Sequence, residues 1–279
     1  MPAAAVLAGL LALGAAALAG RPKVEVLPGD AQMAKGIPVA RVYGTGPGVE
    51  TQKGDRWSAL ADGAYVKTGD RLRTGRAAAA IEFPWTTLIV GAGSTLSIPP
   101  SIVLTAAVEE GRVEERAIGE DIVKLRTPEG VVRGSGHVIV RRHDGKTYVS
   151  AIEGAFDVAT GPGTLRLEAG YGTIIANGER PSPAVELSRI GGAITPGVDP
   201  AYYKRGAPVS LRWESTASRH HVQVLAFDSD RVVHDVEVTG NEYSIQLPLG
   251  LFRWRVLPVP ADAPDGHPSA DGFICIVDD

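Results

Sequence analysis

The feature that most constrains the fold is a period-two alternation of apolar and polar residues, which runs through almost all of the chain after Lys23. The apolar pairs in these runs include Ile81 and Phe83, Leu88 and Val90, Val138 and Val140, and Phe156 and Val158. Turn pairs such as Asp144-Gly145 and Asn177-Gly178 separate the runs. Short alternating runs with this punctuation are typical of strands in a sandwich, a barrel or a β-coil. We therefore predict an all-β fold.

The composition agrees with a folded, turn-rich protein. The 34 glycines and 20 prolines are about a fifth of the 279 residues, against roughly 12% in an average protein and ~25–30% in low-complexity chains. The net charge of −4 argues against a large basic surface, so we predict no nucleic-acid partner. The single cysteine, Cys275, excludes an intrachain disulfide and a metal site of several cysteines, and we expect it to be buried.

The N-terminal segment indicates the compartment. Residues 2–20 carry no charge and consist almost entirely of Ala, Leu, Gly and Val. The run ends in Ala17-Leu18-Ala19, which has the small-x-small pattern of a signal-peptidase site, and Arg21 follows shortly after. We expect export to the periplasm or cell envelope. Residues 1–20 are then a cleaved signal peptide or an apolar helix that anchors the protein, since about twenty apolar residues can just span a bilayer. A buried helix of a cytosolic protein is the remaining interpretation.

Two features describe the organisation of the rest of the chain. Residues 105–117 contain Gly111 and β-branched neighbours, so strand, turn and strand is favoured over a helix. An apolar residue, an acid and then a glycine recur at Gly111, Gly154 and Gly170, which suggests similar strand pairs stacked on one another. Prolines and glycines in 181–200 break the strand rhythm, and we place a domain junction there. The predicted domains are 38–180 and 195–279.

The first of these regions contains a set of short motifs that occur in a fixed order over roughly residues 38–178, at 57–60, 69–75, 80–83, 90–98, 126–128, 132–135, 149–154 and 167–170. This ordered set resembles the FecR-type extracytoplasmic domain family. The resemblance implies an all-β extracytoplasmic domain, jelly-roll-like or coiled. Founding members of the family are plasma-membrane regulators that pass a signal from an outer-membrane receptor to a cytoplasmic sigma factor.

The sequence departs from the family pattern in three places. Ser135 stands where the family usually has threonine, after Gly134, which we expect to permit a tight bend between two strands. Pro84-Trp85-Thr86 replaces an Asp-Gly-Ser-like hairpin turn, so we expect a different turn with Trp85 at its tip. Only about twenty apolar residues precede the exported part. We therefore expect that the chain is not a complete transmembrane regulator of the founding type.

About seven short alternating runs fit into the second region, 195–279, which suits a seven-stranded β-sandwich. In this the region resembles a fibronectin type III or immunoglobulin-like sandwich. Trp213 and Trp254 lie in two of these runs, and we expect both indoles in the core.

The sequence shows no convincing catalytic, cofactor-binding or metal-binding site. His137, His143, His220, His221, His234 and His267 make no metal motif, and we expect them on the surface, with His220 and His221 on opposite faces of a strand. The segment 134–137 lacks the strand–Gly-x-Ser-x-Gly–helix context of a nucleophile elbow. The glycine-rich segment 44–48 has no following helix to cradle phosphate. We predict no catalytic, cofactor-binding or metal-binding residues.

The acids form the one dense cluster, consisting of Glu109, Glu110, Glu114, Glu115, Glu120 and Asp121. A pair of carboxyl groups about 5–10 Å apart would suit glycoside hydrolysis, and several oxygen ligands would suit calcium. We expect a solvated acidic face instead.

Export, two β regions and the lack of a catalytic constellation favour an exported, non-enzymatic envelope protein that binds an envelope protein or a cell-wall polysaccharide. Residues 2–20 provide a possible membrane attachment. The alternative is a periplasmic component of a FecR-like signalling system, which regulates a sigma factor through a separate membrane partner. A third hypothesis is a carbohydrate-active enzyme that uses the acidic cluster.

Overall fold

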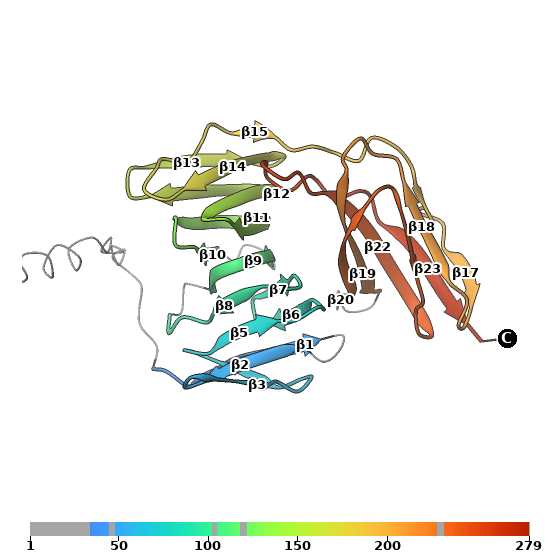
Figure 1. Cartoon of the computed structure of the whole chain (residues 1–279), viewed down its shortest axis with the longest axis horizontal. Helices are drawn as coiled ribbons and strands as arrows, with labels where there is room; N and C mark the ends of the chain where they lie inside the picture. Colours follow the sequence, from blue (N-terminus) through green and yellow to red (C-terminus); the bar gives the residue numbers. More distant parts are fainter. Residues whose placement is uncertain (1–33, 45–47, 102–104, 118–121, 228–231, 279) are drawn as a thin grey trace, which may run out of the picture. The chain divides into compact units, whose positions relative to one another are not determined.

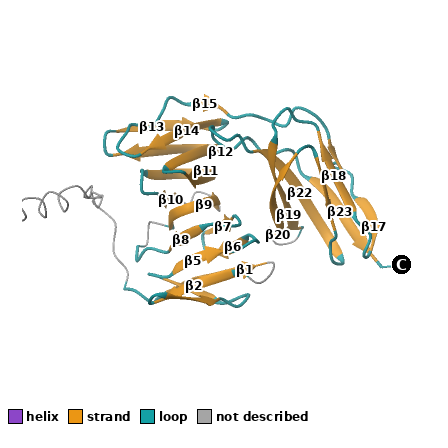
Figure 2. Cartoon of the chain, in the orientation of Figure 1, coloured by secondary structure: helices purple, strands orange, loops and turns teal. Residues whose placement is uncertain are grey.

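The computed structural model describes residues 34–44, 48–101, 105–117, 122–227 and 232–278. All of these residues belong to one compact unit, Ala31–Asp279. The predicted signal peptide or anchor helix at 1–20 therefore lies outside the described residues. Every regular element in the described ranges is a strand (Figure 2), so the all-β prediction is confirmed. Within these ranges, no helix has the length and apolar character needed to cross a membrane.

Fifteen strands form one sheet, which we call the first β region (Figure 1). They are β1 Pro38–Gly44, β2 Val49–Lys53, β3 Arg56–Ala59, β4 Tyr65–Lys67, β5 Arg71–Thr74, β6 Ala79–Glu82, β7 Thr86–Val90, β8 Thr95–Ser97, β9 Ala106–Ala117, β10 Val123–Arg126, β11 Val131–His143, β12 Lys146–Thr160, β13 Gly163–Glu168, β14 Tyr171–Ala176 and β15 Val185–Glu186.

The sheet of the first β region folds over on itself into two facing layers, which we call its walls. The long strands β9 and β12 each take part in both walls. Residues 107–110 of β9 pair with β8, whereas residues 113–117 pair with β7. In the same way, residues 146–151 of β12 pair with β14, whereas residues 155–160 pair with β13. The chain therefore coils, because a strand that leaves one wall continues directly into the other.

Glycines occupy the bends between the walls. Gly111 in β9, Gly136 in β11 and Gly154 in β12 have φ angles of 90°, 118° and 78°, which residues with a side chain rarely adopt. Gly136 and Gly154 are paired across the strands, and a Cβ atom on either would overlap the opposite backbone. The repeated glycine was expected at turns, and Gly111, Gly154 and Gly170 all have positive φ. The bend expected at Gly134 lies at Gly136 instead, inside a single strand.

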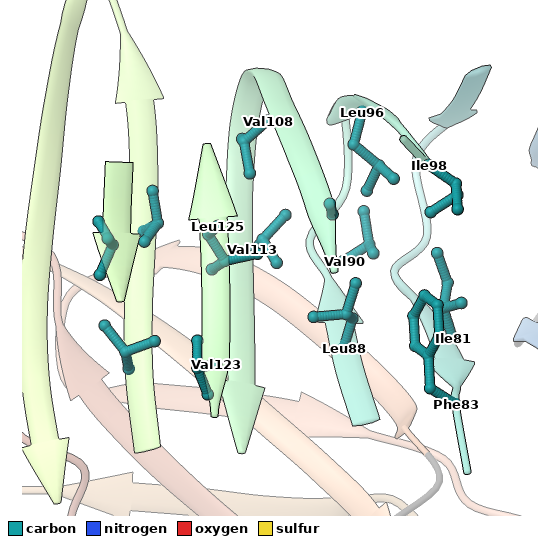
Figure 3. Packing of buried hydrophobic residues seen from close by; sticks show 14 of the residues in the cluster. Ile81, Phe83, Leu88, Val90, Leu96, Ile98, Val108, Val113, Val123 and Leu125 are labelled. Carbon is teal, nitrogen blue, oxygen red and sulfur yellow. The ribbon is translucent and has the colours of Figure 1, made fainter. Parts of the chain in front are cut away.

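The hydrophobic core of the first β region lies between the two walls. Figure 3 shows Leu88 and Val90 of β7 in the same cluster as Leu96 of β8 and Val108 of β9. All four are at most 2% exposed. Trp85 lies in the tight turn between β6 and β7, which the Phe83 amide closes by donating to the Thr86 carbonyl oxygen at 2.9 Å, so its predicted place at the tip of this turn is confirmed. Its ring also packs against the cluster, with its centroid 5.5 Å from that of Phe83. Burial of apolar surface draws the indole back onto the sheet.

The remaining strands form what we call the C-terminal sandwich. Its smaller sheet has the order β16 Ile194–Thr195, β18 Val209–Trp213 and β21 Glu242–Ile245. Its larger sheet has the order β17 Ala201–Lys204, β23 Gly272–Val277, β22 Gly250–Pro258, β19 Arg219–Ala226 and β20 Val232–Thr239.

Trp213 and Trp254 are the centre of the sandwich core, with exposed fractions of 3% and 0%, which confirms their predicted place. The Trp254 indole Nε1 donates a hydrogen bond of 2.9 Å to the carbonyl oxygen of Pro196. Sheet membership changes between β15 and β16. The domain limits drawn from the sequence, 38–180 and 195–279, stay a prediction.

Candidate functional site

The acidic cluster predicted from the sequence is divided by the fold. Glu109 lies at the surface, where it pairs with Arg71, and Glu110 pairs with Arg142. Glu114 and Glu115 are 2% and 0% exposed, so the expected solvated acidic face is wrong for these two residues. Glu120 and Asp121 lie outside the described residues. No group of three His, Cys, Asp or Glu in the described ranges has the geometry of a metal site.

Glu114 is the centre of a buried charge network between the first β region and the C-terminal sandwich. Its Oε1 contacts His137 Nε2 at 2.7 Å and accepts from the Arg255 guanidinium. Its Oε2 accepts from Arg112 Nη2 at 3.2 Å and from Gln223 Nε2 at 3.0 Å. Because Arg112 and His137 belong to β9 and β11, and Gln223 and Arg255 to β19 and β22, one carboxylate joins both regions.

Two further carboxylates extend this network. Asp265 is 1% exposed and accepts from Arg112 Nε at 3.0 Å and from Arg141 Nε at 2.7 Å. Asp235 is 5% exposed and lies 2.6 Å from His221 Nδ1.

The electrostatics of the network suit a structural role. Burial raises the pKa of Glu114, but the charges of Arg255, His137 and Arg112 outweigh burial and hold the pKa well below its usual value. Three arginines balance three carboxylates, as a buried charge cluster requires. A carboxylate that is ionised near neutral pH and is only 2% exposed is poorly placed to exchange protons with a substrate. The network therefore fixes how the two regions meet.

Three of the six histidines are buried rather than exposed, which corrects the sequence prediction. His137, His220 and His221 are 2%, 0% and 8% exposed. His220 packs edge-on against Trp213 inside the sandwich, whereas His221 faces Asp235 on the other side of the sheet, so the opposite orientation is confirmed. Burial lowers the pKa of His220 and keeps the imidazole neutral near pH 7.

Glu115 is a second buried acid, and it lies in the core of the first β region. No hydrogen bond of good geometry reaches either carboxyl oxygen from the described residues, although the Thr105 and Thr86 hydroxyls lie near. Burial raises the pKa of Glu115 to about 8, and Thr105 and Thr86 only partly offset that shift. An acid with this pKa is neutral at pH 7, and its isolation from solvent makes it unsuitable as a general acid.

A groove of about 600 Å³ opens beside the charge network. Its lining includes Arg112, Arg142, Lys146, Tyr148, Arg219 and His221. Most of these cations already have partners, because Arg142 pairs with Glu129 and Arg219 with Glu237. The groove is therefore polar but largely neutralised.

The outer face of the larger sandwich sheet carries a contiguous surface that we call the apolar row. It consists of Tyr202, Cys275, Leu251 and Phe227, which are neighbours across β17, β23, β22 and the end of β19. Tyr202, Leu251 and Phe227 are 72%, 37% and 52% exposed. Cys275 is half-buried, less than expected. The corresponding face of the smaller sheet is polar, with Ser210 opposite Ser244 and Arg212 opposite Glu242.

The apolar row continues an interface that is already formed inside the molecule. Gln223, Leu225 and Phe227 lie at alternate positions of the β19 segment, so they share one face. Gln223 bonds to Glu114, and Leu225 packs with Ala78 and Ile89 of the first β region. Phe227 is the next position along and is uncovered. The periodicity did not mark the apolar row, because β23 is apolar on both faces and the outer face of β22 and β19 mixes apolar residues with Arg253, Arg255 and Gln223.

Two other motifs have no site geometry. His137 and Gly134 both lie within β11 and pair with β12, so the segment between them is a regular strand with a bend. Residues 45–47 of the glycine-rich segment lie outside the described residues.

Comparison with known proteins establishes no family for this chain. No family model matches the chain, and no curated protein does. Two crystal structures, each titled as a "putative anti-sigma factor" from Parabacteroides distasonis ATCC 8503, match 44% of this chain with 18% identity and a TM-score of 0.35. The matches span 66% and 64% of those chains, just under two thirds. The FecR-type resemblance stays a prediction from the sequence motifs.

Proposed function

We propose that the chain is an exported, non-enzymatic binding protein, and that the apolar row of the C-terminal sandwich binds a partner protein. The observation that carries this proposal is the exposure of Tyr202, Leu251 and Phe227 side by side on one sheet face. Contiguous apolar surface that is open to water marks interaction sites. Its continuity with the internal interface at Leu225 indicates an occupant of the same kind, a protein surface with apolar side chains.

The buried charge network supports the non-enzymatic part of the proposal. Three groups whose chemistry would suit catalysis are buried and hydrogen-bonded within the network, namely Glu114, Asp235 and His137. The accessible surfaces are sheet faces and strand edges, which bind partners through shape and apolar contact.

The test uses the full chain as bait in an envelope extract, with captured proteins identified by mass spectrometry. The variant Phe227→Ser/Leu251→Ser removes the apolar row. The control Tyr171→Ser/Ile122→Ser removes two apolar residues of similar exposure, 43% and 48%, from the first β region. We expect a defined set of proteins that the control retains and the row variant loses. Capture that does not depend on Phe227 and Leu251 contradicts the proposal.

Light scattering after size exclusion provides the second arm. A dimer of the native chain that the row variant converts into monomers would make a second copy the occupant, and would overturn the partner-protein proposal. Binding to purified cell-wall polysaccharide that the row variant loses would assign the face to a glycan instead.

A second candidate function is a role in a FecR-like signalling system, with a separate membrane partner that carries the cytoplasmic part. The ordered motifs of residues 38–178 favour it. A sigma-factor or receptor gene beside this one would support this candidate, whereas cell-wall or secretion genes would support an unrelated envelope role.

A further inference from the structure

The N-terminal end of the first β region differs in charge from the rest of the molecule. Residues 34–76 contain eight Lys and Arg against four Asp and Glu, although acids outnumber these cations 32 to 28 in the whole chain. These residues form β1 to β5, the strands at one end of the sheet order (Figure 1). An excess of positive charge at one end of an acidic protein attracts negatively charged surfaces to that end.

Four of these cations form what we call the basic corner: Lys35, Lys53, Arg56 and Lys67. Lys53 and Arg56 pair at the tip of the β2–β3 hairpin. Thr51 of β2 pairs with Leu72 of β5. Continuing this antiparallel register by two positions places Lys53 near Asp70, which lies in the turn of residues 67–70.

Lys35 completes the corner. The turn of residues 34–37 before β1 lies beside the turn of residues 67–70, since the Gly36 amide donates to the Thr68 carbonyl at 2.8 Å and the Lys35 stem lies over Gly69. All four cations are exposed, and none has an ion-pair partner among the described residues.

Amphipathic side chains accompany these cations. Ile37 and Tyr65 are 38% and 54% exposed, and the half-buried Trp57 ring lies beneath the Arg73 guanidinium at 4.5 Å. Tyrosine and tryptophan beside lysine and arginine are the residues that favour the boundary between lipid headgroups and water. The basic corner therefore combines charge with side chains suited to that boundary.

The position of the corner along the chain favours a membrane as the surface that it binds. Lys35 follows the apolar residues 2–20 by fifteen positions, and Arg21 and Lys23 lie between them. Basic residues close to an apolar segment bind anionic lipid headgroups by Coulomb attraction that decays within a Debye length.

We propose that the basic corner binds anionic phospholipid headgroups and holds this end of the first β region against a membrane. The corner and the apolar row lie on different strands, so this inference does not depend on the proposed binding of a partner protein.

The test measures binding of the full chain to vesicles by lipid titration, with neutral phosphatidylcholine or with 30% phosphatidylglycerol added. The variant Lys53→Gln/Arg56→Gln/Lys67→Gln is compared with Arg133→Gln/Arg180→Gln/Arg189→Gln, which removes the same charge from exposed arginines of the opposite end. The apolar residues 2–20 contribute equally to both vesicle types, so the ratio of the two affinities isolates the charge.

We expect the native chain and the control to prefer the anionic vesicles, and the corner variant to lose about ten-fold or more of that preference, since each membrane-facing cation contributes roughly five-fold. On anionic vesicles, hydrogen exchange of residues 34–37, 53–57 and 65–70 slows in the native chain. Equal affinity of the native chain for both vesicles, or an equal loss in both variants, overturns the proposal. Corner-dependent binding to a soluble acidic polysaccharide that exceeds vesicle binding would also overturn it.

Discussion

The buried carboxyl group of Glu115 makes the stability of the first β region depend on pH in a direction opposite to that of an ordinary acid. Burial raises its pKa to about 8 in the folded chain, against 4.5 for an ordinary glutamate carboxyl group. Between these two pH values the folded state holds a proton that the unfolded state has lost. The free energy of unfolding therefore falls by about 1.4 kcal/mol per pH unit over this window, roughly 5 kcal/mol in all.

The variant Glu115→Gln removes this dependence, because an amide of nearly the same shape carries no charge at any pH. We expect the two proteins to have similar stability near pH 4.5, and the variant to gain steadily up to pH 8, with no further gain above. Urea unfolding followed by circular dichroism at several pH values from 5 to 9 measures this difference. Parallel stability profiles of the two proteins would refute the assignment of Glu115 as a buried neutral acid.

Three other substitutions test the remaining structural claims. Trp254→Ala empties the centre of the sandwich core and is expected to cost about 3–5 kcal/mol in calorimetry, whereas Trp57→Ala at the half-buried surface costs much less; equal costs would contradict the core assignment. Gly154→Ala forces a side chain into the Ser135 carbonyl and is expected to lower the melting temperature sharply, unlike Gly178→Ala, which has open space at a turn of similar φ. Glu114→Gln leaves buried arginines without their counter-charge and is expected to cost about 3–5 kcal/mol at pH 7. Since the pKa of Glu114 is lowered, its contribution is present above the usual carboxyl pKa and lost below it, so native and variant stabilities should converge in acid.

The period-two pattern predicted the strands, but it did not predict for every strand which side chains face the core. Val108 and Val113 both lie in the core although they are five positions apart, an odd spacing that a regular strand does not allow. Gly111 stands between them with φ of 90° and shifts the phase by one position. The sequence marks this glycine as a turn, but a turn signal alone does not tell by how many positions the alternation shifts. Without that shift, Glu115 cannot be placed on the inward face.

Glu114 was unpredictable for a different reason. It faces away from the core of the first β region, as an acid on an alternating strand should. It is buried because Gln223 and Arg255, more than one hundred positions later in the chain, cover that face. No local pattern reports whether an outward face is covered, since covering depends on the packing of distant strands.

The same reasoning explains why the apolar row is informative. On the outer face of the larger sandwich sheet, charged and polar residues such as Gln223 and Arg255 lie where the first β region covers them and supplies partners. Phe227 and Leu251 lie beyond that cover, where solvent would favour polar side chains. On this face the polar residues are therefore covered and the apolar residues exposed, which is the opposite of what burial within this chain alone would favour. A second protein surface over Phe227 and Leu251 removes this mismatch, because those side chains then lose their contact with water as Leu225 already has.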